Sequence, residues 1–95
     1  LVLFCIEDFV QTLGALEIAE ARRDRAARSR SLTRAITALT ALELGVDRTA
    51  PMAESLLHFY GAAKLLLLDS IRVVDLRRIA ELKQDFRDIA VAFAG

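Results

Sequence analysis

This 95-residue chain has no excess of positive or negative charge, only one cysteine and no long apolar run. Thirteen basic and thirteen acidic side chains give a formal net charge of zero, so no long-range field would steer the protein toward nucleic acid or an acidic membrane. The one cysteine, Cys5, lies on an apolar helical face and is expected to be buried and reduced, so nothing suggests an oxidising compartment. No apolar run approaches the ~18 residues that would predict a membrane span.

Proline occurs once and glycine four times, while 55% of the residues are hydrophobic, which favours helices over a turn-rich β fold. The length favours a single domain, residues 1–95, in which folding would bury only about two-thirds of the unfolded surface. Residue 1 is leucine and no charged segment precedes the apolar start, so we expect no signal peptide and interpret the chain as the middle of a longer protein.

Apolar spacing and capping residues predict four helices, at about residues 1–23, 24–45, 50–71 and 75–93. Asp24, Thr49 and Asp75 are the expected N-caps, and Gly45 is the expected end of the second helix. Because the connections are short, neighbouring helices should be antiparallel, which predicts an all-α, antiparallel up-down four-helix bundle. If the break near Asp75 did not form, the last two helices would be one long helix and the chain would have to dimerise.

Two faces of the segment 31–47 organise the rest of the chain. One face is bulky and apolar, and the other, Ser31, Arg34, Ala38, Ala41 and Gly45, is made mostly of small residues that permit close helix approach. The first helix is expected to use Val2, Cys5, Phe9, Leu13 and Leu16 for its apolar face, and the third to use Ile71. The predicted core of the bundle comprises Leu32, Ile36, Leu39, Leu56, Tyr60, Ile79, Leu82 and Phe86.

The third helix is apolar almost all round in its C-terminal half, which requires either burial or a partner. An ordinary core face and a groove for a partner helix are both compatible with this pattern. Our hypothesis is that a client helix lies against small residues of the second helix and a side stripe of the third. The predicted client-binding residues are Ala38, Ala41, Gly45, Phe59, Ala62, Leu65 and Leu66.

Residues with catalytic chemistry are few. His58 is the only histidine, no second ligand accompanies it at metal-site spacing, and no glycine-rich loop follows a strand. We therefore expect no enzyme activity, no metal and no cofactor. The five arginines between Arg22 and Arg30 lie among acidic residues without interleaved aromatic residues. A solvent-exposed turn between two helices is therefore favoured over a nucleic-acid-binding patch.

Several segments, taken in order, match one family pattern. They are the start LVLFCIEDF, Asp24 with Arg28 and Ser29, the run SLTRAI with Leu39, Leu42, Val46 and Asp47, then Ala53, Ser55, Leu56, Phe59 and Tyr60, and finally Ala92 and Phe93. This collinear set resembles the flagellar secretion chaperone family, FliS. Ile6 stands where that family has a tyrosine, and Leu65 and Leu66 stand where it has basic residues.

The resemblance implies a cytoplasmic bacterial export chaperone. Such proteins bind the disordered C-terminal segment of flagellin, prevent its premature polymerisation and bring it to the flagellar export apparatus. The alternative is a structural or adaptor bundle whose spare apolar face serves self-association as a homodimer, or binds another secretion partner. A nucleic-acid-binding module that uses Arg22 to Arg30 is a weaker third interpretation.

Overall fold

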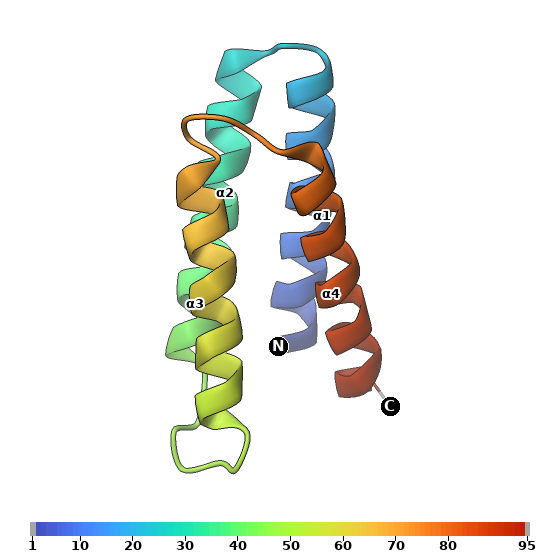
Figure 1. The fold of residues 1–95 in the computed structure, drawn as a ribbon. Coiled ribbons are helices and arrows are strands. Elements are labelled where there is room, and N and C mark those ends of the chain that lie inside the picture. Colours follow the sequence, from blue (N-terminus) through green and yellow to red (C-terminus); the bar gives the residue numbers. More distant parts are fainter. Residues whose placement is uncertain (1, 95) are drawn as a thin grey trace.

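Residues 2–94, which the computed structural model describes, are all-helical (Figure 1). They form four helices, α1 (Val2–Ala21), α2 (Arg25–Leu44), α3 (Ala53–Asp69) and α4 (Leu76–Ala94), with no strand in the same range. The break near Asp75 is therefore present, and α3 and α4 are separate helices. Leu1, the first residue of the predicted first helix, lies outside the described residues.

The turn between α1 and α2 combines a left-handed residue with an N-cap. Arg23 has φ 55°, the conformation that glycine usually supplies at the end of a helix. The N–H of Arg23 donates to the Glu20 carbonyl at 3.1 Å and that of Asp24 donates to the Ala19 carbonyl at 2.9 Å, the pair of bonds that defines a Schellman motif. The Asp24 carboxylate then accepts the Ala27 N–H at 3.1 Å, which confirms the predicted N-cap of α2.

The connection between α2 and α3 differs from the prediction that Thr49 caps α3. The hydroxyl and the backbone N–H of Thr49 both donate to the Asp47 carboxylate, at 2.6 and 3.0 Å, and these bonds hold the pKa of Asp47 below its ordinary value. Thr49 is therefore committed to a turn of its own, and α3 begins only at Ala53, with Met52 in the N-cap position. The predicted N-cap at Thr49 was wrong because an acceptor two residues earlier competes for it.

Asp75 is the N-cap of α4, as predicted from the sequence. Its carboxylate accepts the backbone N–H groups of Arg77 and Arg78, at 3.1 and 3.3 Å, at the start of α4. At the other end of the connection, Ser70 is buried and its hydroxyl donates to the Leu66 carbonyl at 2.8 Å. A polar side chain can be buried there because its own helix supplies the acceptor.

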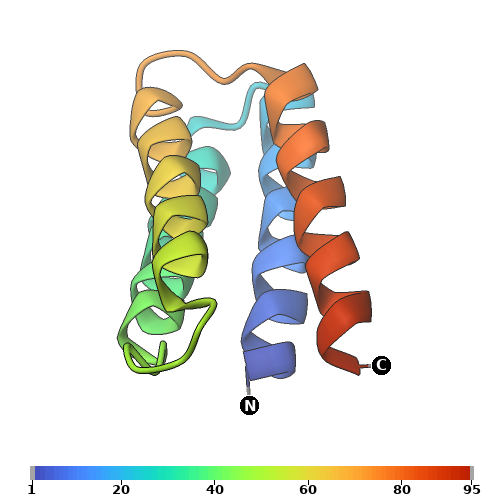
Figure 2. The same cartoon turned by 60° about the horizontal axis from the view of Figure 1, so that its bottom comes forward.

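The helices are arranged so that three pairs are close neighbours. The α1 backbone closely approaches α2 and α4, and α2 closely approaches α3, but α3 and α4 scarcely approach each other. The α1–α2 and α3–α4 connections lie at one end, and the α2–α3 connection lies at the other, near the start of α1 and the end of α4 (Figures 1 and 2). The α3–α4 seam is thus the widest side of the bundle.

Every helix contributes to one apolar core. Six of the eight predicted core residues are buried, whereas Ile36 and Leu56 are partly buried at its edge. On α1 the predicted Phe9, Leu13 and Leu16 are buried, but near the start of the helix Ile6 is buried in place of Cys5, which is half-buried. Val2 and Ile71, which the sequence places on core faces, are exposed. Val2 is the first residue of α1, and Ile71 lies beyond the end of α3. The buried core comprises Ile6, Phe9, Leu13, Leu16, Leu32, Ala35, Leu39, Leu42, Tyr60, Ala63, Leu67, Ile79, Leu82 and Phe86.

Candidate partner-binding surfaces

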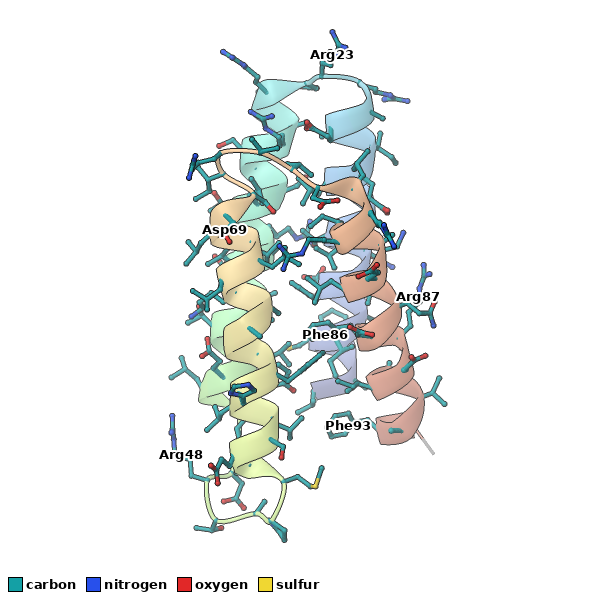
Figure 3. All side chains as sticks on the ribbon, in the orientation of Figure 1. Arg23, Arg48, Asp69, Phe86, Arg87 and Phe93 are labelled. Atoms are coloured by element: carbon teal, nitrogen blue, oxygen red, sulfur yellow. The ribbon has the colours of Figure 1, made fainter. Side chains whose placement is uncertain are left out.

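Large aromatic side chains fill the wide seam between α3 and α4. Phe86 points from α4 toward α3 (Figure 3), where its ring centroid lies 4.8 Å from that of Phe59 and 6.1 Å from that of Tyr60. On its other side, Phe86 lies 4.5 Å from Phe9 of α1. One ring therefore joins three helices, at separations typical of favourable aromatic pairs. The seam is closed near its interior by rings, while the backbones remain apart.

Outside this cluster the same seam forms an open groove of about 300 Å³. Its α3 wall is apolar and carries Phe59, Ala62, Ala63 and Leu66. Its α4 wall carries Leu82 with three charged side chains, Arg78, Glu81 and Asp85. The groove thus offers an apolar strip with a charged border, the pattern that suits an amphipathic helix.

Ion pairs hold the other helix pairs together but do not cross this seam. Both lysines of the chain are used: Lys83 of α4 pairs with Glu17 of α1, and Lys64 of α3 lies 2.6 Å from the buried Oε1 atom of Glu43 on α2. Within residues 2–94, no ion pair joins α3 to α4. The α3–α4 seam is accordingly the side with the fewest direct links.

The structure divides the predicted client-binding residues between several places. Phe59, Ala62 and Leu66 lie together in the α3–α4 groove. Gly45 ends α2 and lines a separate small cavity of about 150 Å³ at the end of the bundle. Ala38 is partly buried against the core, and Ala41 is exposed on α2. Leu65 lies on α3 with 65% of its surface exposed, outside the groove.

The N-terminal end of the small-residue stripe of α2 lies beside α1, and no residue of the stripe lines the α3–α4 groove. Ser31 and Arg34 of that stripe line a groove together with α1 residues, and Arg34 also pairs with Asp8 of α1. The periodicity identifies the stripe, but it cannot say which neighbouring helix the stripe meets. Of the predicted client-binding residues, Phe59, Ala62 and Leu66 line the α3–α4 groove, whereas Ala38, Ala41 and Gly45 do not.

Several exposed apolar side chains occur near the end of α3. Leu65 is joined there by exposed Leu68, Ile71 and Val73, the last of which is 73% exposed. The sequence hypothesis named only Leu65 from this group. The uninterrupted run from Leu65 to Leu68 and the apolar residues of the following connection are the signal that could have identified the rest.

Side chains with catalytic chemistry are not brought together. His58 is exposed on α3, and Cys5 is a free, half-buried thiol on α1. Within the described part of the chain, no three side chains of metal-ligating type are grouped closely enough to hold an ion. In the same part, no helix has the length and apolar character needed to cross a bilayer.

Comparison of the chain with protein-family models, with curated proteins and with solved structures gives no match.

Proposed function

We propose that this protein is an export chaperone of the flagellar secretion type, which binds the disordered C-terminal segment of flagellin. In this proposal the chain is an antiparallel up-down bundle in the cytoplasm, without enzyme activity or cofactor. It keeps the client unpolymerised and brings it to the export apparatus. Two lines support the proposal, the collinear resemblance to the FliS family and the presence of an apolar groove that no part of residues 2–94 covers.

The α3–α4 groove is the observation on which the proposal rests. An amphipathic client helix would place its apolar side chains against Phe59, Ala62 and Leu66, and its polar side chains near Arg78 and Asp85. Each Leu or Phe that becomes fully buried would contribute roughly 1.5–3 kcal/mol, against which the ordering of a disordered segment must be set. A few well-buried client side chains are therefore enough for measurable affinity.

Titration calorimetry with a flagellin C-terminal peptide tests the groove. Ala62→Arg adds a long charged side chain at an exposed position inside the groove, where arginine is also a good helix former. It should weaken peptide binding by about tenfold or more, which corresponds to about 1.4 kcal/mol, with little change in thermal stability. The matched control is Ala80→Arg, an exposed alanine of α4 that does not line the groove.

Equal affinity of the wild type, Ala62→Arg and Ala80→Arg would exclude this groove as the client site. An absence of flagellin binding combined with a concentration-dependent dimer mass would instead favour the adaptor alternative, in which the exposed Leu65, Leu68, Ile71 and Val73 serve self-association.

A further inference from the structure

The charge of this neutral chain is strongly segregated along the sequence. Six arginines and one aspartate give residues 22–34 a net charge of +5, so the remaining residues carry −5. The basic segment covers the α1–α2 turn and the first half of α2. Because charges more than about 10 Å apart are largely screened at physiological salt, a partner near this segment would experience its positive charge and not the neutrality of the whole chain.

A groove of about 610 Å³ lies beside this basic segment, between α1 and α2. It is lined only by those two helices and their turn, whereas the α3–α4 groove is lined only by the other two. In Figure 1 the α1–α2 pair lies behind the α3–α4 pair. Its floor consists of small side chains, namely Thr12, Ala15, Ala19, Ala27 and Ser31. Because these side chains are small, the groove is deep enough for the backbone of another helix to approach closely.

The groove is lined by exposed apolar surface and by several arginines. Ile18 lines it and leaves 54% of its surface exposed. Arg22, Arg30 and Arg34 also line it, against one acidic side chain, Asp24, whose carboxylate already caps α2. Arg34 pairs with Asp8 but remains 66% exposed, while Arg22 and Arg30 form no ion pair within the described range.

We propose that the α1–α2 groove is a second docking site, which takes an acidic amphipathic helix of a partner protein. The apolar side chains of that helix would lie over Ala15, Ile18 and Ala27, and its carboxylates would meet Arg22 and Arg30. Charge complementarity selects the partner, because arginine and carboxylate groups form strong charge-assisted hydrogen bonds. The site is independent of the flagellin groove, so its test does not depend on the function proposed above.

Nucleic acid fits this groove less well. The lining includes exposed apolar surface and a carboxylate but no aromatic side chain on which a base could stack. An amphipathic protein helix satisfies both the small and apolar lining and the arginines.

Fluorescence anisotropy with designed peptides tests the site. The probe is a labelled amphipathic helix of about 20 residues, built from leucine, alanine and glutamate, which is long enough to span about 30 Å. The comparison peptide replaces every glutamate by lysine. The protein should bind the acidic peptide saturably, with affinity that falls as salt rises, and should bind the basic peptide at least about tenfold more weakly.

Charge reversal then locates the site. Arg22→Glu combined with Arg30→Glu should weaken the acidic peptide by about tenfold or more. The control, Arg48→Glu combined with Arg87→Glu, makes the same change in net charge at exposed arginines away from the groove (Figure 3) and should have much less effect. Amide chemical shifts of the wild-type protein provide a readout that needs no variant, and they should change around Ala15, Ile18 and Ala27.

Four results would overturn the proposal. These are equal affinity for both peptides, equal loss in the two double variants, shift changes confined to α3 and α4, and tighter binding of a single-stranded oligonucleotide than of the acidic peptide.

Discussion

Tyr60 is the residue whose environment can be observed most directly. Its side chain is buried in the aromatic cluster, and burial raises its pKa above the ordinary value of 10.0. Because it is the only tyrosine and the chain has no tryptophan, ultraviolet absorbance at alkaline pH reports on this phenol alone. The titration midpoint should lie above pH 10 in the folded protein and near it in denaturant.

The raised pKa of Tyr60 also makes the stability of the folded protein depend on pH in the alkaline range. A raised pKa means that the folded state holds the phenolic proton more tightly than the unfolded state, so this stabilisation is complete below pH 10.0 and is lost as the pH rises through the folded pKa. Tyr60→Phe should remove that part of the alkaline loss of stability. A folded-state midpoint at or below the denatured one would contradict the burial of the hydroxyl-bearing ring.

Arg23 holds a conformation that its side chain disfavours. With φ at 55°, an L-residue other than glycine carries a steric penalty of roughly 1–2 kcal/mol. Arg23→Gly should therefore raise the free energy of unfolding by up to about 1 kcal/mol, since the greater freedom of glycine in the unfolded chain offsets part of the gain. Urea denaturation measures the effect. Arg22→Gly is the control and should give no gain, because Arg22 does not have a positive φ.

At the scale of single helices, α2 carries two apolar residues that the sequence places on the same core face but that are buried to different extents. Leu39 is fully buried, whereas Ile36 lies partly buried at the edge of the same core. Leu39→Ala should lower the free energy of unfolding by about 2–5 kcal/mol, and Ile36→Ala should lower it by less. Urea denaturation of the two variants compares them directly. A larger loss for Ile36→Ala would mean that α2 is rotated relative to the arrangement described.

Helix ends could be predicted where one local interaction decides them. Asp24 and Asp75 cap α2 and α4 because their carboxylates meet free N–H groups of the next turn and no nearer donor competes. The prediction for Thr49 was wrong because two local interactions compete there, and the bonds to Asp47, two residues earlier, form in place of a helix cap. The spacing of apolar residues is likewise local, which is why all four helices are recognisable in the sequence.

At the scale of the whole molecule, the candidate site could be predicted only in part. Phe59, Ala62 and Leu66 share a face because helical geometry fixes their relation, and they line one groove. Their pairing with the small stripe of α2 could not be predicted, because it depends on which helices are neighbours. Only the N-terminal end of the stripe, Ser31 and Arg34, lines a groove with α1, and the groove partner of α3 is α4, whose Arg78, Glu81 and Asp85 the sequence did not identify as site residues.

We propose that this bundle captures the C-terminal segment of flagellin. The most direct measurement is the molar mass in solution, by light scattering during gel filtration, of the protein mixed with full-length flagellin monomer. We predict a one-to-one complex, with no complex when the flagellin lacks its C-terminal segment. Unchanged masses of both proteins after mixing, or an equal complex with the truncated flagellin, would contradict the claim.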